Sequence, residues 1–447
     1  MRARAAAWAK HGPVARPDSR SGRTRTAIPG ALVLLQLIVA HPVVTFATTP
    51  LPDGATRLPF ENLEGLVLVE ARLQGADRDT SGLLALDTGA GFLALDLPLA
   101  LRLGLSATDA PSGGIALAER PLKRFGLGSL QIDLVTPLLT IDAGIVRRFT
   151  DRPVLGLLGQ RPFTGRALIV DYRAEQLTIL PVPQMRERSL DASRQALAGH
   201  LSDSARAIPF ELAGDGKILV RGGIPGADSG SAARDLTWIV DTGATRCVLF
   251  ESALGDDRLH HEWPTMVGLY APTLLGDEPA RVALTPAIAL RAPGGNVAEE
   301  DVETVIIGGP LARRLELAVG ERVHGLIGYS FLGRHRVGID YVNRVLWLDP
   351  LPAGWEGRPY RDSQIGIQLE RRAGAITVAG VVRDSPAAAA GIRIGDRVVT
   401  LGGTPSGQLD VPAAIRRLEG RPGTSITLTL ERGRMLLTHK LLRRRLL

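Results

Sequence analysis

The sequence predicts a mostly β protein with two pseudo-symmetric β lobes and a small α+β domain at its C-terminus. Three observations lead to this class. The 447 residues are too many for one compact core. A set of motifs occurs twice in the same order, and the last part of the chain has a pattern unlike either copy. We expect lobe 1 at residues 55–185, lobe 2 at 205–350 and the C-terminal domain at 362–447.

An internal repeat defines the two lobes. Each copy carries, in the same order, a Pro-Phe-Glu segment, an Asp-Thr-Gly-Ala segment, a Gly-apolar-apolar-Gly segment and an Asp-Tyr pair. These segments stand at 59–61, 87–90, 156–159 and 171–172 in the first copy, and at 209–211, 241–244, 325–328 and 340–341 in the second. Several ordered motifs with similar spacing make chance a poor explanation, so we interpret the copies as duplicated lobes.

Short strands are expected throughout both copies. Glu64–Arg72 and Lys217–Arg221 are apolar-rich and bounded by turn residues, which is typical of strands. Leu83–Leu86 and Leu236–Val240 are brief aliphatic runs suited to buried strands. Pro98–Leu103 is the one short helix that we expect, since no stretch in either copy shows a long helical period.

The repeated Asp-Thr-Gly indicates paired carboxylates. A buried carboxylate is costly unless it is paired or hydrogen-bonded, and a pseudo-two-fold axis would bring Asp87 and Asp241 face to face. Two carboxylates about 3 Å apart cannot both ionise, so they share one proton. One then takes a proton from a water molecule while the other donates to the scissile carbonyl. This chemistry requires no metal and no cofactor.

Both copies resemble the retropepsin-like aspartic protease family, in the duplicated form that bacteria place in one chain. The family pattern, apolar-apolar-Asp-Thr-Gly-Ala followed by apolar-apolar-Gly, is present in each. The resemblance implies that Asp87 and Asp241 are catalytic, that Thr88 and Thr242 interlock beneath them, and that each apolar-apolar-Gly segment packs on its own Asp loop. The supporting residues are Thr88, Gly89, Gly159, Thr242, Gly243 and Gly328.

Two departures from the family pattern lead to further hypotheses. The second copy has Thr245 after its Ala, but the first has Gly91, so the first copy is a candidate for degeneration. Ala90 and Ala244 replace a hydroxyl that would stabilise an ionised carboxylate, so we expect activity at mildly acidic to neutral pH. The flaps that close over a substrate are expected near 111–115 and 266–270, with ordinary surface hairpins as the alternative.

The C-terminal segment resembles a bacterial PDZ domain. Its most specific stretch runs from Ser385-Pro386 through Ala390-Gly391 to Gly395-Asp396. The resemblance implies that a peptide adds as a strand beside a helix at Val411–Leu418. The peptide carboxylate would then bind near Ile365, Gly366 and Ile367, and Val411 would line the groove. The alternative is a small domain that only packs on the peptidase.

The N-terminus reads as a targeting segment. Residues 1–47 hold seven Lys or Arg and one Asp, and so carry +6 of the net charge of +7. The apolar run at 31–40, followed by small residues near 45–47, is the pattern of a cleaved signal peptide, with an uncleaved anchor as the alternative. We therefore expect a periplasmic or secreted protein, on a membrane only if this segment is retained. The remaining chain is nearly neutral, so no nucleic-acid partner is expected.

Other residue patterns add no competing active site. Cys247 is the single cysteine, and we interpret it as a small buried hydrophobe. The histidines show no metal-ligand spacing, so no metal site is expected. Asp171 and Asp340 are expected to cap turns.

The sequence therefore predicts an aspartic endopeptidase acting on protein or peptide substrates, with C-terminal peptides binding at the PDZ domain. A catalytically inactive peptide-binding scaffold on the same fold is the alternative. A membrane-anchored regulatory protease is a third hypothesis.

Overall fold

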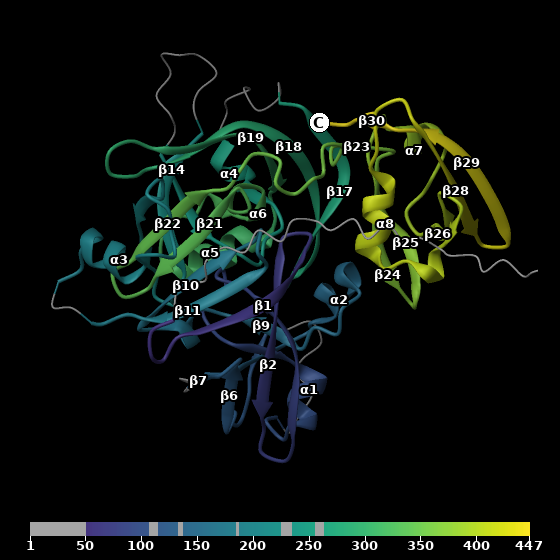
Figure 1. Cartoon of the computed structure of the whole chain (residues 1–447). Helices are drawn as coiled ribbons and strands as arrows, with labels where there is room; N and C mark the ends of the chain where they lie inside the picture. The colour runs from purple at the N-terminus through teal and green to yellow at the C-terminus, as the bar shows by residue number, and fades with distance from the viewer. Residues whose placement is uncertain (1–50, 107–114, 133–136, 185–186, 225–234, 255–262) are drawn as a thin grey trace, which may run out of the picture. The chain divides into compact units, whose positions relative to one another are not determined.

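The computed structural model (Figure 1) describes most of the chain after residue 50. The described ranges are 51–106, 115–132, 137–184, 187–224, 235–254 and 263–447. The targeting segment at 1–47 and most of the first flap candidate lie outside these ranges. Residues 49–447 form one compact unit, and none of its described helices is both long and apolar enough to cross a membrane. The mostly β class is confirmed.

Lobe 1 contains eleven of the described strands. They are β1 (Thr56–Leu63), β2 (Leu66–Gln74), β3 (Asp79–Leu86), β4 (Ala94–Asp96), β5 (Ala116–Leu117), β6 (Arg124–Leu127), β7 (Leu130–Ile132), β8 (Leu139–Ile141), β9 (Gly156–Leu158), β10 (Arg166–Asp171) and β11 (Gln176–Pro181). Its helical segments are α1 (Leu97–Arg102), α2 (Gly144–Thr150) and the 3-10 turn η1 (Arg161–Phe163). Helix α3 (Leu190–Ala196) follows and leads toward lobe 2.

Lobe 2 repeats this order with longer hairpins. Its described strands are β12 (Arg206–Pro209), β13 (Glu211–Leu212), β14 (Ile218–Gly223), β15 (Leu236–Val240), β16 (Cys247–Phe250), β17 (Thr265–Thr273), β18 (Gly276–Leu290), β19 (Val297–Ile307), β20 (Gly325–Ile327), β21 (His335–Asp340) and β22 (Val345–Pro350). The helices are α4 (Glu251–Leu254), α5 (Pro310–Val319) and α6 (Tyr329–Leu332). The extra length of the second copy lies mainly in the long hairpin of β18 and β19.

One sheet joins the two lobes. The strand order in this sheet is β12-β22-β21 from lobe 2, followed by β10-β11-β1 from lobe 1. The two lobes meet where β21 pairs with β10 in antiparallel orientation. Ile169 lies opposite Gly338, and these two positions are equivalent in the repeat because the Asp-Tyr pairs have the same offset. The pseudo-two-fold axis therefore passes between them. One hydrophobic core includes residues from both lobes.

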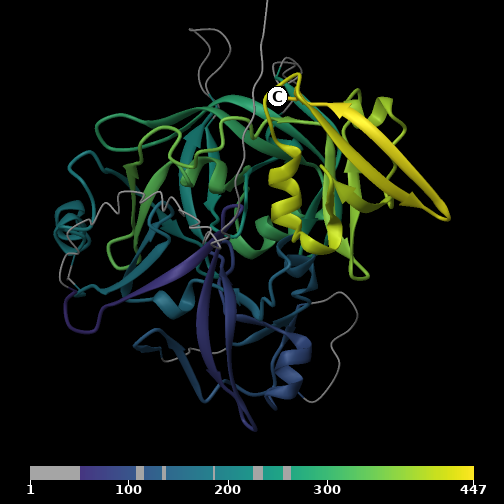
Figure 2. The same ribbon diagram turned by 45° about the vertical axis from the view of Figure 1, so that its right-hand side comes forward.

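The C-terminal domain has its own sheet and core. Its strands are β23 (Ser363–Gln364), β24 (Ile367–Arg372), β25 (Ala375–Val381), β26 (Arg397–Leu401), β27 (Thr404–Pro405), β28 (Ser425–Arg432), β29 (Met435–Leu442) and β30 (Arg444–Arg445), and its helices are α7 (Pro386–Ala389) and α8 (Val411–Leu418), with a 3-10 turn η3 (Ser406–Gln408). Figures 1 and 2 show α8 beside the sheet. Ser385 and Asp410 cap the two helices by accepting backbone N–H groups.

Two expectations about local structure are corrected. The strand expected at Glu64–Arg72 begins only at Leu66, because Glu64 and Gly65 both take positive φ and form the tight turn between β1 and β2. Helices α2, α4, α5 and α6 were not expected within the two copies, and α5 is the longest of them. It begins with a proline in its first turn and ends at Gly320 in the left-handed conformation, the usual boundary signals of a helix.

Candidate active site

Each predicted catalytic aspartate directly follows a buried strand that is paired in parallel with the apolar-apolar-Gly segment of its own lobe. Asp87 follows β3, which pairs with β9, and Asp241 follows β15, which pairs with β20. The Asp87 amide donates to the carbonyl of Leu158 at 3.0 Å, and the Asp241 amide donates to Ile327 at 3.0 Å. The same local contact thus fixes the start of each Asp-Thr-Gly loop.

The glycines that end the apolar-apolar-Gly segments allow this packing. A Cβ atom on Gly159 would lie 2.2 Å from the carbonyl oxygen of Phe92, and one on Gly328 would lie 2.2 Å from that of Arg246. Phe92 and Arg246 occupy equivalent positions in the two loops. Any side chain at either glycine would push the loop away from its supporting strand.

Thr88 and Thr242 interlock across the lobe interface. The Thr88 hydroxyl donates to the carbonyl of Val240 at 2.8 Å and accepts from the Thr242 amide at 3.0 Å. The Thr242 hydroxyl donates to the carbonyl of Leu86 at 2.9 Å and accepts from the Thr88 amide at 3.1 Å. Both threonines are buried, so four hydrogen bonds hold the two loops together without competition from water.

The two carboxyl groups lie together above this interlock. A Cβ atom on Gly89 would lie 2.6 Å from Cγ of Asp241, and one on Gly243 would lie 2.8 Å from Cγ of Asp87. Each glycine therefore faces the carboxyl group of the other lobe. The Gly243 amide donates to Oδ1 of Asp241 at 2.8 Å, and the two carboxyls lie close enough for each to change the acidity of the other.

Burial and mutual proximity alter the acidity of the pair. Burial raises the pKa of Asp87 well above its usual range, and the charge of Asp241 raises it further. Burial also raises the pKa of Asp241, but hydrogen bonds from the Gly243 amide and from Asp87 act in the opposite direction. Two carboxyls with raised pKa values this close together favour a state in which the pair holds one proton between them.

Sequence reasoning missed a buried cation beside this pair. Lys217, at the turn before β14, is 6 % exposed and forms an ion pair with Asp215. Its positive charge acts to lower the pKa of both Asp87 and Asp241, against the effect of burial. Gly65 and Gly216 occupy equivalent turn positions, so the first copy has Leu66 where the second has Lys217, and the charge is a lobe 2 feature. The loss of symmetry at that position is the signal that could have found it.

The same turn explains the departure at Gly91. A Cβ atom on Gly91 would lie 2.1 Å from the carbonyl oxygen of Asp215. A serine or threonine at this position would therefore collide with the backbone of lobe 2. Gly91 meets a packing requirement of the lobe interface, which is a different cause from degeneration of the first copy.

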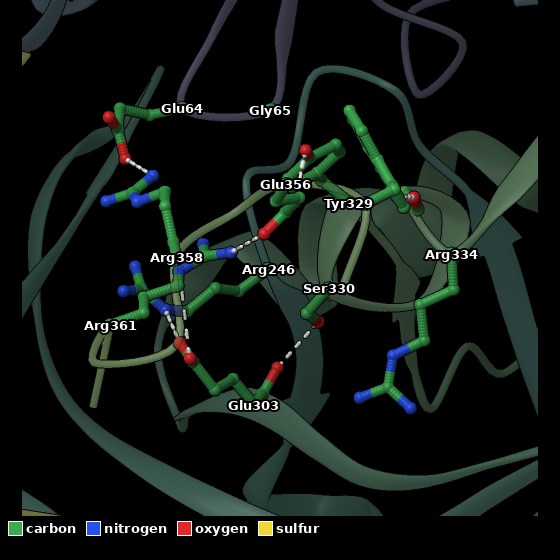
Figure 3. A network of polar contacts seen from close by, with 12 residues as sticks. Glu64, Gly65, Arg246, Glu303, Tyr329, Ser330, Arg334, Glu356, Arg358 and Arg361 are labelled. Carbon is green, nitrogen blue, oxygen red and sulfur yellow. Dashed lines mark hydrogen bonds and ion pairs between the residues drawn. The ribbon is translucent and has the colours of Figure 1, made fainter. Parts of the chain in front are cut away.

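Tyr329 directly follows Gly328 and contacts lobe 1 near the β1–β2 turn (Figure 3). A Cβ atom on Gly65 would lie 2.4 Å from its ring, so the β1–β2 turn of lobe 1 rests on it. Its hydroxyl donates to Glu356 and accepts from Asn62 at 3.4 Å. Gln160 takes the equivalent place in lobe 1 and donates to the carbonyl of Thr88.

A buried acidic group anchors the segment that leads to the C-terminal domain. Figure 3 shows Glu303 reached by Arg246 and Arg361, with Arg246 donating at 2.7 Å. Burial alone would raise the pKa of Glu303, but the positive charges of Arg246 and Arg361 outweigh it and lower the pKa to about 2. Residues 351–361, which resemble a linker in the sequence, are therefore held on lobe 2.

The second flap candidate belongs to the β17–β18 hairpin. Leu274, at its turn, packs against an apolar cluster of lobe 1 that includes Leu63 and Leu68. The hairpin therefore reaches from lobe 2 to lobe 1. Four of the five residues of the first candidate lie outside the described ranges.

Other side chains with reactive groups have structural environments. Cys247 is fully buried, and burial raises the pKa of its thiol. Asp171 and Asp340 accept backbone N–H groups within their turns, as expected of caps. In the part of the chain that the structure describes, no three His, Cys, Asp or Glu side chains lie close enough to hold a metal ion.

The predicted peptide site lies at one edge of the C-terminal sheet. Strand β24 is the last strand on that side, and α8 packs beside it. Ile365, Ile367 and Val411 are buried in the domain core. Gly366 has φ +87°, and a Cβ atom there would lie 2.3 Å from that of Ser385, so only glycine fits the loop.

Residues 377–432 match the family model of the PDZ domain. This C-terminal domain is a PDZ domain. The match lies inside the expected range of 362–447. No curated protein matches the chain in sequence.

Three solved structures are similar to parts of the chain. An aspartic proteinase from Irpex lacteus is 13 % identical, with a TM-score of 0.41, over 66 % of this chain and 97 % of that one. Basic 7S globulin from soybean is 12 % identical, with a TM-score of 0.39, over 68 % and 97 %. The photosystem II D1 C-terminal processing protease is 24 % identical, with a TM-score of 0.18, over 19 % and 23 %. These likenesses are distant, so the site itself must carry the functional argument.

Proposed function

We propose that the chain is an aspartic endopeptidase, a retropepsin-like pair of lobes in one polypeptide, whose PDZ domain recognises peptides. The observation that carries this proposal is the placement of Asp87 and Asp241. The two carboxyls come from duplicated loops, and each lies against the Asp-Thr-Gly glycine of the other lobe. Few structural roles account for two partly buried acidic groups held together in this way, because removing each one from water is costly.

A single proton on the pair gives the two aspartates different roles, one as a general base and the other as a general acid. Asp241, the more readily ionised partner, acts as a general base and removes a proton from a water molecule as its oxygen attacks the scissile carbonyl carbon. Asp87 donates its proton to the carbonyl oxygen, which gives a neutral tetrahedral diol. When the diol collapses, the C–N bond breaks, the leaving nitrogen takes a proton from Asp241, and a diol hydroxyl returns one to Asp87.

The supporting residues serve this chemistry by position. Thr88 and Thr242 hold the loops in register, while Gly89 and Gly243 leave room for the opposite carboxyl. Gly159 and Gly328 let the supporting strands approach. The raised pKa of both aspartates supports activity at mildly acidic to neutral pH. An inactive peptide-binding scaffold is the alternative.

We also propose that the protein works outside the cytoplasm. The basic and apolar pattern of residues 1–47 supports export to the periplasm or beyond, with membrane attachment if this segment is not removed.

Cleavage of an unfolded protein by residues 48–447 tests the proposed activity. We expect cleavage between pH 4 and 7 by the wild type and none by the Asp241→Asn variant. Loss of activity in Asp241→Asn, with an unchanged circular dichroism spectrum, would assign Asp241 to the reaction. Equal cleavage by both proteins would refute the proposal.

A further inference from the structure

The outer end of the PDZ groove is occupied by lobe 1. Asp151, directly after helix α2, accepts the amide of Val411 at 2.7 Å and also the guanidinium of Arg371. Val411 is the first residue of α8, and Arg371 belongs to the edge strand β24. Helix α2 lies against both of these elements. A carboxylate of lobe 1 therefore stands between the helix and the strand that a peptide would have to enter.

Ion pairs extend this contact on both sides of Asp151. Arg148 bridges Glu370 of β24 at 3.1 Å and Asp277 of the β17–β18 hairpin at 2.8 Å. Arg152 pairs with Asp410, the cap of α8, at 3.1 Å. A single arginine thus connects lobe 1, the hairpin of lobe 2 and the PDZ strand.

The PDZ domain also holds the hairpin directly. The Arg383 amide donates to the carbonyl of Val267 at 2.8 Å. The side chain of Gln368 exchanges two hydrogen bonds with the backbone of Tyr270, at 3.1 and 2.9 Å. Gln368 lies on β24, so the strand that forms the peptide groove also fixes the hairpin.

The junction is polar and incompletely packed. A cavity of about 230 Å³ opens where α2, the hairpin and the PDZ sheet meet, and its lining includes Phe149, Tyr270 and Glu370. The arginines of these ion pairs are 26–28 % exposed, so salt can weaken the contact, although the carboxylate of Glu370 is almost fully buried.

We propose that binding of a peptide in the PDZ groove displaces residues 148–152 and thereby releases the β17–β18 hairpin. A peptide that adds to β24 needs the edge of that strand and the start of α8, where Asp151 now lies. Displacement of Asp151 removes Arg148 from Glu370 and from Asp277, because these residues belong to one short segment. The hairpin that spans the two lobes then loses one of its anchors. Peptide binding and release of the hairpin do not depend on the proposed endopeptidase activity. Only the expected effect of that release on cleavage rests on the proposed function.

The carboxylate of Asp151, which now occupies this end of the groove, indicates the chemistry of the ligand. Val411 N–H and Arg371 together bind a carboxylate, so they favour an acidic side chain in the incoming peptide. An antiparallel peptide whose last residue lies opposite Ile367 would place the residue four positions upstream opposite Arg371, since each strand residue faces one residue of its neighbour. The groove therefore fits a peptide with a free C-terminus and an acidic residue about four positions upstream of it.

Binding is tested with a fluorescent decapeptide that ends in Leu and has Glu three and four positions earlier. The protein is residues 48–447 carrying Asp241→Asn, which prevents cleavage. We expect Asp151→Asn to tighten binding about tenfold, since a competing charge-assisted hydrogen bond is weakened. Asp203→Asn, an exposed position, is the matched control. The peptide amide and the Gln-containing peptide should bind more weakly. Equal affinity of Asp151→Asn and the control would overturn the proposed competition.

Coupling is tested by hydrogen exchange on the same inactive protein. Saturating peptide should speed the exchange of amides in Thr265–Thr273, and unchanged exchange would overturn the release of the hairpin. Neither measurement depends on catalysis. If the changes in binding and exchange occur but the wild-type protein does not cleave a substrate, the endopeptidase proposal fails and the coupling stands. If the wild type cleaves but the peptide changes neither measurement, the coupling fails alone.

Discussion

Gly89 of lobe 1 touches the carboxyl group of Asp241 in lobe 2, so closely that a Cβ atom there would lie 2.6 Å from Cγ. Gly243 has the reciprocal relationship with Asp87. The glycines therefore determine how near the two carboxyls can approach each other. Since the shared proton depends on that approach, these positions test the catalytic proposal without removing an acid.

We predict that Gly89→Ala lowers kcat/KM by at least about 100-fold, because the added methyl group would occupy the space of the Asp241 carboxyl, which must shift. Cleavage assays on the full mature chain measure this effect. Gly214→Ala is the matched control, since a Cβ atom there has nothing within 4 Å. Wild-type activity in Gly89→Ala would contradict the described contact.

Removal of either acid should separate activity from stability. A carboxyl with a raised pKa in the folded state stabilises the fold at low pH and loses that contribution as the pH rises. We therefore expect Asp87→Asn and Asp241→Asn to be inactive and yet to melt about 2–4 °C above the wild type at pH 8, with no gain at pH 4. Thermal unfolding at the two pH values measures this, and Asp203→Asn should show no such difference. Lower stability of both variants at pH 8 would refute the assignment.

Lys217 should set the pH range of the reaction. Its charge lowers the pKa of both aspartates, so Lys217→Gln should move both limbs of the pH–rate profile to higher pH. The measurement is kcat/KM as a function of pH. Lys440→Gln, in the PDZ strand β29, makes the same chemical change away from the dyad and should leave the profile in place. A shift of equal size in both variants would show that Lys217 has no special role.

Glu303 should govern resistance to acid. Its pKa is lowered to about 2 in the folded state, so its stabilising effect is complete above the ordinary pKa of 4.5 and is lost as the pH falls from there toward 2. This loss lowers the free energy of unfolding by about 3 kcal/mol. Glu303→Gln should lack this step when stability is followed by denaturant titration from pH 5 to 2. Glu431→Gln, which removes a partly exposed partner of Arg397, should retain it.

Much of the fold could be predicted from the sequence, because local residue patterns determine many of its strands and helices. The β15 strand matches its predicted bounds, since five consecutive apolar or β-branched residues between polar turns suit a strand buried on both faces. Helix α8 also matches, because Asp410 and Pro412 mark its start. The Glu64–Gly65 turn was missed because its requirement for positive φ is not visible in an alternating apolar run.

The sequence alone determined that two acidic loops occur in duplicated surroundings, because the Asp-Thr-Gly motif is repeated. It also determined the PDZ domain, through the capping and glycine pattern after residue 380. Only the tertiary structure decided which groups surround the acids. Lys217, Tyr329 and Gly91 act through contacts between lobes that are distant in sequence. The same holds for Asp151 in the PDZ groove. Local propensity is encoded over a few residues, whereas charge, burial and steric fit depend on which segments meet in space.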